Sequence, residues 1–98
     1  MRIIARSTII KFYEKNTQAK TALQEWFGKT SEADWSHFAD IKNTFNSVDS
    51  VGNKRFVFNI KGNDYRLVAI VLFIPKIVFI RFIGTHSEYD KITDIQNI

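Results

Sequence analysis

The stretch RFVFNIKGNDYRLVAIVLFIPKIVFIRFIG, from Arg55 to Gly84, decides the fold of this 98-residue chain. It contains three apolar runs, RFVFNI, YRLVAIVLF and IVFIRFIG, which the short segments KGND and IPK separate. Short apolar runs rich in β-branched and aromatic residues predict strands, and tight connections between them predict antiparallel hairpins. The second and third runs are apolar at consecutive positions, so we expect helices to cover one face of the sheet.

The first half of the chain is expected to supply these helices. Residues 2–5 can form a short strand, and Ser7 is expected to cap a helix whose apolar residues recur at helical spacing. A second helix is predicted from Thr17 to a stop at Gly28, with Trp26 among its core residues. The segment TSEADWSHFADIKNTF, residues 30–45, suggests a short third helix or a turn followed by a helix.

Two further segments complete the predicted fold. Residues 46–54 are predicted to form a loop with a turn at Gly52-Asn53, because turn-forming residues dominate them. A short C-terminal helix is expected near Thr85 or Ser87, either of which can cap it. Helices followed by an antiparallel sheet define an α+β fold, and the length fits one domain spanning residues 1–98.

The composition excludes several classes of protein. A hydrophobic content of 45% is too high for a disordered chain, and there is no cysteine for a disulfide or a thiolate metal site. With only two histidines, we expect neither a metal site nor a cofactor. The apolar run from Leu67 to Pro75 is far shorter than the about 20 residues of a membrane helix. Because Arg6 also interrupts the N-terminal apolar run, we expect a soluble cytoplasmic protein without a membrane partner.

Arg66 and Arg81 each interrupt an apolar strand. Either each arginine marks a solvent-facing position or reaches the edge of the sheet, or the two together form an anion-binding surface. A two-residue loop at Pro75-Lys76 would place Arg81 opposite Ile70 and on the face of Arg66, whereas a three-residue loop would separate them. The sequence leaves both registers open.

Basic residues are concentrated in the half of the chain that forms the sheet. Residues 51–98 hold seven basic and four acidic side chains, and so carry three of the four units of net positive charge. Such a charge suits a phosphate-rich partner without proving one. The residues that can extend the surface of the two arginines are Lys54, Arg55 and Lys61, with Asn59 and Asn63 as polar site residues or simple turn formers.

The segment after the last strand carries groups suited to proton transfer. His86 is either a solvated helix-start residue or a general acid or base, since the unperturbed pKa of histidine lies near neutrality. Tyr89 follows at helical spacing and can stack on a base, bind a phosphate or join proton transfer. Asp90 either orients His86 or merely favours the helix dipole. His37, between Trp35 and Phe38, is expected to be a packing or surface residue.

Two motifs in this region resemble the HigB family of bacterial toxins, within the wider RelE-like group. They are N-x-x-G-N-x-Y-R, residues 59–66, and I-R-F-x-G-T-H-x-E-Y-D, residues 80–90. The resemblance extends from Phe56 to Ile92, while the N-terminal half matches in the length, order and character of its elements. It implies N-terminal helices packed on a twisted antiparallel sheet, followed by a short C-terminal helix.

The resemblance also implies an activity and partners. Members of this group are endoribonucleases that cut mRNA, usually on the translating ribosome, and so stop protein synthesis. Each is neutralised by an antitoxin, here of the helix-turn-helix HigA type, which makes most of the contacts of the pair with operator DNA. Cleavage in this group requires no metal, because the 2′-hydroxyl of the substrate attacks the adjacent phosphate.

By this resemblance, Arg66, Arg81, His86 and Tyr89 are the expected catalytic residues. Arg66 and Arg81 match the strand arginines of the family, and His86, Tyr89 and the supporting Asp90 match its terminal motif. The expected RNA-binding residues are Lys54, Arg55, Asn59, Lys61 and Asn63. Asp64 stands where relatives often carry a basic residue, which argues against an RNA contact at that position.

Two other functions compete with this interpretation. The chain can be a non-catalytic module whose basic sheet binds RNA or the ribosome without cutting it. It can also be a structural domain whose basic face meets an acidic protein. A small helix-turn-helix gene beside this one would favour a toxin. Mapping of mRNA 5′ ends separates cleavage from binding.

Overall fold

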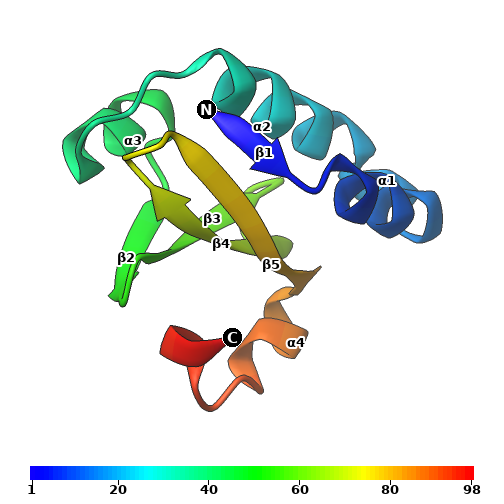
Figure 1. The fold of residues 1–98 in the computed structure, drawn as a ribbon. Coiled ribbons are helices and arrows are strands. Elements are labelled where there is room, and N and C mark those ends of the chain that lie inside the picture. The colour runs from blue at the N-terminus through cyan, green and yellow to red at the C-terminus, as the bar shows by residue number, and fades with distance from the viewer.

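The computed structural model describes all 98 residues, which form an open five-stranded sheet and several helices (Figure 1). The strands lie in the order β1-β5-β4-β3-β2, with β1 parallel to β5 and every other pair antiparallel. They are β1 (Arg2–Ile4), β2 (Val48–Gly52), β3 (Arg55–Ile60), β4 (Tyr65–Leu72) and β5 (Ile77–Thr85). The predicted meander therefore forms the centre of the sheet, and the α+β prediction is confirmed.

Helices lie on both sides of this sheet. The long ones cover one face, whereas the C-terminal segment lies on the opposite side (Figure 1). The helices are α1 (Arg6–Lys15), η1 (Thr17–Ala19), α2 (Lys20–Glu32), α3 (Phe38–Thr44), α4 (His86–Asp90) and η2 (Ile95–Asn97). The face of the sheet opposite α1, α2 and α3, which is called the open face below, is therefore reached by α4 and η2.

The core lies between the sheet and the N-terminal helices. Alternate residues of β4, namely Tyr65, Leu67, Ala69 and Val71, belong to this core, so Arg66 and Val68 point to the open face. Trp26 and Trp35 are both 2% exposed, as expected for core aromatics. Removal of this apolar surface from water is the main favourable contribution to folding.

Several predicted element boundaries are wrong. The first helix starts at Arg6 after Ala5 and has no side-chain cap, so Ser7 lies inside it. The second continues past Gly28 to Glu32, because Gly28 adopts helical geometry and the helix goes on to bury Thr30. The predicted loop at residues 46–54 contains strand β2, since pairing with β3 overrides the weak strand propensity of its sequence, VDSVG.

The hairpin between β4 and β5 has neither of the two loop lengths considered from the sequence. Leu72 pairs with Ile77 across a four-residue loop, so Ile70 lies opposite Phe79. Farther along, Val68 pairs with Phe82 and Ala69 with Ile80, which leaves Arg81 as the extra residue of a β-bulge. Arg81 and Phe82 both lie opposite Val68 of β4. Arg81 therefore shares the open face with Val68 and Arg66.

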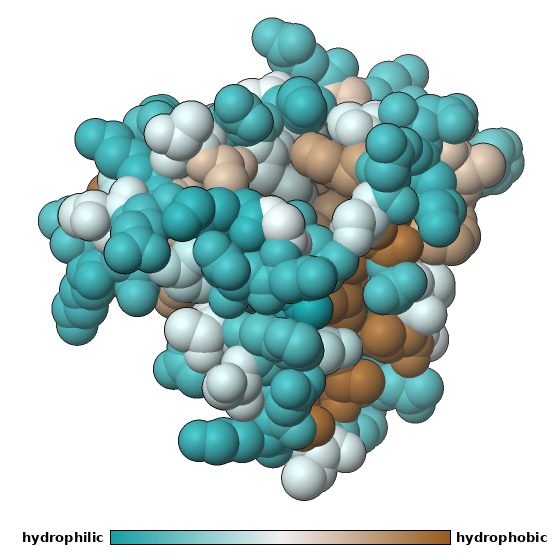
Figure 2. Space-filling model, turned by 180° about the vertical axis from the view of Figure 1, so that it is seen from behind, coloured by the Kyte–Doolittle hydropathy of each residue, from teal (hydrophilic) through white to brown (hydrophobic).

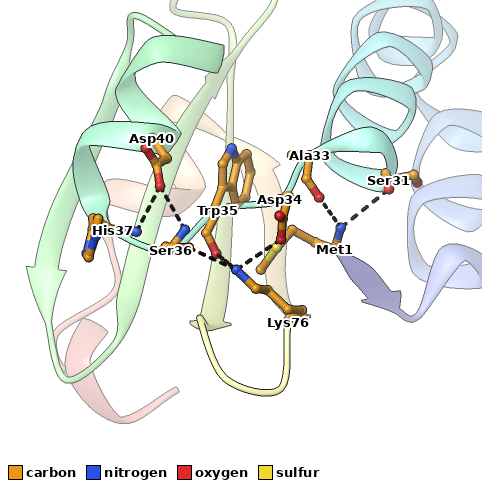
Figure 3. Close-up of polar contacts among 9 residues, drawn as sticks. All are labelled: Met1, Ser31, Ala33, Asp34, Trp35, Ser36, His37, Asp40 and Lys76. Atoms are coloured by element: carbon orange, nitrogen blue, oxygen red, sulfur yellow. Dashed lines mark hydrogen bonds and ion pairs between the residues drawn. The ribbon is translucent and has the colours of Figure 1, made fainter.

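Lys76 fastens this hairpin loop to the segment between α2 and α3 (Figure 3). Its Nζ donates to the main-chain oxygen of Trp35 at 2.7 Å and to Ser36 Oγ at 3.1 Å, and lies 3.0 Å from Asp34 Oδ1. The N-terminal amino group donates to the main-chain oxygens of Ser31 and Ala33 beside it. These bonds hold the N-terminal half against the sheet at the end remote from α4.

The surface seen from behind is mainly hydrophilic, apart from one continuous hydrophobic area on one side (Figure 2). The most exposed large hydrophobic side chain is that of Ile74, in the β4–β5 loop, at 90%. None of the helices combines the length and the hydrophobicity needed to cross a membrane.

Candidate functional site

Arg66 lies at the centre of the candidate site, where β4 begins and β5 ends. It pairs with Asn59 of β3 on one side and with Gly84 of β5 on the other. Its Nη1 donates to the main-chain oxygens of Asn63 and Tyr65, both at 3.2 Å. Each of these carbonyl oxygens uses only part of the donor capacity of the guanidinium, so Arg66 keeps N–H groups for an anion.

Helix α4 starts at the same end of the sheet because of a capping box. Glu88 N donates to Thr85 Oγ1 at 3.1 Å, and Thr85 N donates to Glu88 Oε1 at 2.8 Å. The hydrogen bonds from the main chain and side chain of Thr85 hold the pKa of Glu88 below its ordinary value. The main-chain N–H of His86 also donates to the oxygen of Asp64 at 3.1 Å, which ties α4 to the β3–β4 loop. Thr85 is thus the cap that was predicted.

Tyr89 lies on the inner side of α4. Its ring centroid is 6.5 Å from that of Phe82. Burial raises the pKa of the Tyr89 phenol; the positive charge of Arg66 opposes this shift, and the carboxylates of Asp49 and Asp90 add to it. The phenol is therefore protonated at neutral pH and within the electrostatic influence of Arg66.

His86 and Asp90 form a pair along α4. His86 Nε2 lies 3.4 Å from Asp90 Oδ2, and the two side chains are 51% and 60% exposed. A carboxylate at this distance restricts the orientation of the imidazole ring. No group of three or more His, Asp or Glu side chains comes together as a metal ion would require.

The four predicted catalytic residues differ in their exposure to solvent. Arg66 and Tyr89 are half-buried, whereas His86 and Arg81 are exposed. Arg81 precedes Phe82, whose ring centroid lies 6.5 Å from that of Tyr89, and its own side chain makes no hydrogen bond or ion pair within the protein.

The predicted RNA-binding residues fall into two groups at opposite ends of β3. The first group lies beside Arg66 and consists of Asn59, Lys61 and Asn63. The Nδ2 of Asn59 donates to Ser47 Oγ, and Lys61 Nζ lies 3.6 Å from Asp64 Oδ2. Lys54 and Arg55 lie at the other end of β3, where Arg55 is roughly 13 Å from Asn59 at about 3.3 Å per residue.

Arg55 is engaged by the C-terminal segment. Its Nη2 donates to the main-chain oxygen of Ile98 at 2.8 Å, and its Nη1 to that of Asn53 at 3.0 Å. Asn53 Nδ2 donates to the oxygen of Gln96, and Gln96 Nε2 donates to that of Val51. Residues 91–98, called the strap below, therefore run from α4 across the open face to the β2–β3 hairpin.

Two buried side chains do not belong to the helix-side core. Val57 and Val68 point to the open face, yet they are only 3% and 0% exposed. Asp49, Phe82 and Gln96 also belong to this region and were not identified from the sequence. Asp49 lies in the segment predicted as a loop, for which no face of the sheet could be assigned.

Gly84 is expected to be intolerant of a side chain. A Cβ at this position would lie 2.5 Å from Phe82 Cζ and 3.1 Å from Glu88 Oε1. Gly84→Ala should lower the free energy of unfolding by about 1–3 kcal/mol, the usual cost of overpacking, and shift the NMR signals of Tyr89. Gly28→Ala is the matched control, because nothing lies within 4 Å of its Cβ, and it should raise stability by about 0.5–1 kcal/mol. Equal effects of the two substitutions in a denaturant titration would contradict the steric argument.

The structure is a small α+β domain with arginines in two central strands and a histidine and a tyrosine in the short helix that follows them. Residues 19–92 match the family described as HigB toxin, RelE-like toxic component of a toxin-antitoxin system. The match covers most of the chain, and this protein therefore belongs to the HigB toxin family.

Curated relatives support the same conclusion over nearly the whole length. The chain is 30% identical over 95 residues to the "mRNA interferase HigB" of Escherichia coli O6:H1, covering 95% of this chain and 92% of the relative. It is 32% identical over 97 residues to the "mRNA interferase toxin HigB" of Escherichia coli K12, covering 97% and 93%. The "mRNA interferase HigB" of Shigella flexneri is equally similar.

Proposed function

We propose that this toxin is a metal-independent endoribonuclease that cleaves mRNA on the ribosome and thereby inhibits translation. The observation that carries the proposal is the position of Arg66, which lies opposite Gly84 in the sheet, directly before the capped start of the helix α4 that carries His86 and Tyr89. The relatives named mRNA interferase support an RNA substrate.

Cleavage requires removal of the 2′ proton, stabilisation of the additional negative charge, protonation of the leaving oxygen and alignment of the RNA chain. We assign a group of the open face to each of these four requirements. The 2′-hydroxyl of the substrate loses a proton and attacks the adjacent phosphate, and the 5′-oxygen leaves with a proton. Arg66 and Arg81 stabilise the additional negative charge of the transition state, where preorganised donors are most effective. Guanidinium groups suit this task because they stay charged and bind phosphate oxygens with paired N–H donors.

His86 and Tyr89 are assigned the two proton transfers. The carboxylate of Asp90 stabilises the imidazolium that forms when His86 removes the 2′ proton. Tyr89 keeps its proton at neutral pH and donates it, or a hydrogen bond, to the leaving 5′-oxygen. Asp90 is in this scheme a positioning residue.

The RNA chain is held by polar groups around Arg66. Asn59, Lys61 and Asn63 lie beside it and contact the sugar-phosphate backbone, which orients the attacking group in line with the leaving oxygen. Lys54 and Arg55 bind a more distant part of the strand, once the strap has released Arg55.

The proposed partners follow from the family. The toxin pairs with a HigA-type helix-turn-helix antitoxin in the cytoplasm, and reaches operator DNA through that antitoxin. Its positive charge of +4 favours association with the ribosome, whose surface is rich in phosphate.

The test maps the 5′ ends of mRNA after incubation with the protein, with and without ribosomes. Cuts are expected with ribosomes. A wild-type protein that binds ribosomes but makes no cuts would instead be a non-catalytic binding module.

A further inference from the structure

An apolar patch occupies the end of the open face that is remote from α4. It consists of five large side chains from β1, β4 and β5, namely Ile4, Ile70, Leu72, Ile77 and Phe79. The pairing places them side by side, because Leu72 lies opposite Ile77, and Phe79 lies between Ile70 and Ile4. Ile70 and Leu72 continue the alternation that points Arg66 and Val68 to the open face.

The side chains of this patch are not part of the hydrophobic core. All five are half-buried, yet none belongs to the helix-side core or to the partly buried hydrophobic residues that pack against it. The patch is therefore apolar surface of the sheet that the packing of the N-terminal helices does not use.

Three arginines stand around the patch, one from each of three strands: Arg2, Arg55 and Arg81. Arg2 pairs with Ile77 on one side of the patch, and Arg55 pairs with Ile70 on the other. The side chains of Arg2 and Arg81 are exposed, whereas Arg55 is half-buried and bound to the strap. The patch thus has a positively charged margin.

This margin is not neutralised within the chain. The strands β1, β3, β4 and β5 contain no Asp or Glu. Acidic side chains around the open face lie in other elements, namely Asp49, Asp64, Glu88, Asp90 and Asp94. None of them forms an ion pair with Arg2, Arg55 or Arg81. Arg2 and Arg81 are therefore available to carboxylates of another protein.

The chemistry of the patch favours a protein over a nucleic acid. Exposed apolar patches bordered by polar residues mark protein interaction sites, and interfaces combine an apolar centre with a polar rim and are enriched in arginine. Single-stranded nucleic acids are instead held by stacking on aromatic rings, and Phe79 is the one aromatic residue of the patch. A second copy of this chain fits poorly, because a symmetric dimer would bring two sets of arginines together.

We propose that this patch is the docking surface for an acidic amphipathic segment of the antitoxin. Apolar side chains of the segment cover the five patch residues, and its carboxylates pair with Arg2 and Arg81. Because Arg81 is also assigned to the cleaved phosphate, the docked segment withdraws it from the RNA and stops cleavage. This inference rests on the proposed function and names the surface through which the same site is regulated.

The first test uses toxin labelled in its isoleucine methyl groups and the unlabelled full-length cognate antitoxin. The NMR signals of Ile70 and Ile77 should shift when the complex forms. The signal of Ile41 should stay, because this residue is 0% exposed in the helix-side core. A complex that forms without shifts of Ile70 and Ile77 would overturn the inference.

A second measurement compares two charge reversals by their affinity for the antitoxin. Arg2→Glu should weaken binding by about tenfold or more, the scale on which arginines at interfaces contribute, and the loss should diminish at high salt. Lys29→Glu is the matched control, because this exposed lysine lies in α2 on the other side of the sheet, and it should leave the affinity unchanged. Equal losses in the two variants would show an effect of net charge and contradict the docking surface.

The remaining outcomes separate this inference from the proposed function. A short RNA whose 2′-hydroxyls are all methylated should shift the amide signal of Gly84, which pairs with Arg66, and leave Ile77 in place. If RNA shifts Ile77 and the antitoxin does not, the patch is an RNA surface and the inference is wrong. It is also wrong if the Ile77 signal moves with toxin concentration alone, as a dimer interface would require. If no mRNA is cut but the antitoxin still shifts Ile70 and Ile77, the nuclease proposal fails and the docking surface stands.

Discussion

Replacing His86 with alanine is expected to lower the rate of mRNA cleavage by about 10²–10⁴-fold, the usual contribution of a positioned general acid or base. His86 is half-exposed, so its removal leaves no buried partner unsatisfied and the fold should be retained. The measurement is the single-turnover rate on ribosome-bound mRNA, with substrate affinity determined separately. The loss should appear in the rate and not in the affinity.

The second histidine of the chain provides a control for this prediction. His37 is exposed and precedes α3 on the helical side of the molecule, where its main-chain N–H donates to Asp40. His37→Ala should therefore leave the rate unchanged. Near-normal cleavage by His86→Ala would remove His86 from the proposed mechanism.

Arg66→Ala is expected to lower cleavage by about 10²–10³-fold, as the loss of one preorganised donor to a charged transition state typically does. Arg66→Lys should recover only part of the rate, because an ammonium group keeps the charge but lacks the paired donors of a guanidinium. Loss of the positive charge should also raise the pKa of Tyr89 further, which an NMR or ultraviolet titration can detect.

Two controls test whether the slower cleavage by Arg66→Ala has another cause, namely a disturbed loop or the change in net charge. Arg66 also binds the carbonyl oxygens of Asn63 and Tyr65, so thermal unfolding of each variant shows whether the loop is intact. Arg2→Ala removes an equal charge from the exposed strand β1, at the opposite edge of the sheet from β2, and should not affect the rate. If Arg2→Ala and Arg66→Ala slow cleavage equally, the effect is one of net charge alone.

Much of the fold could be predicted because its signals are local. The strands from Arg55 to Thr85 follow from apolar runs and short connections, and the cap at Thr85 follows from a Thr with Glu88 three residues later. Strand β2 could not be predicted in this way, since its residues form a strand only because β3 lies beside them. The bulge at Arg81 likewise arises from the pairing of two strands.

The candidate site could likewise be predicted only in part from local sequence signals. The motifs identified Arg66, Arg81, His86 and Tyr89, which lie in β4, in β5 and in the helix α4 that follows β5. The strap was not anticipated, because the bonds from Asn53 to Gln96 and from Arg55 to Ile98 each join residues 43 positions apart. Pairing over such separations leaves no periodic pattern in the sequence.

The sequence by itself determined the α+β class, the central meander and the residue types available for phosphate chemistry, since these depend on local propensity and apolar pattern. Only the tertiary structure decided that Arg66 lies opposite Gly84, that Arg55 is held by the strap, and that Trp26 lines a pocket beside Asn59. The reason is physical: burial, electrostatic influence and hydrogen-bond partners are set by neighbours in space, which the packing of the helices and of the strap on the two faces of the sheet brings together.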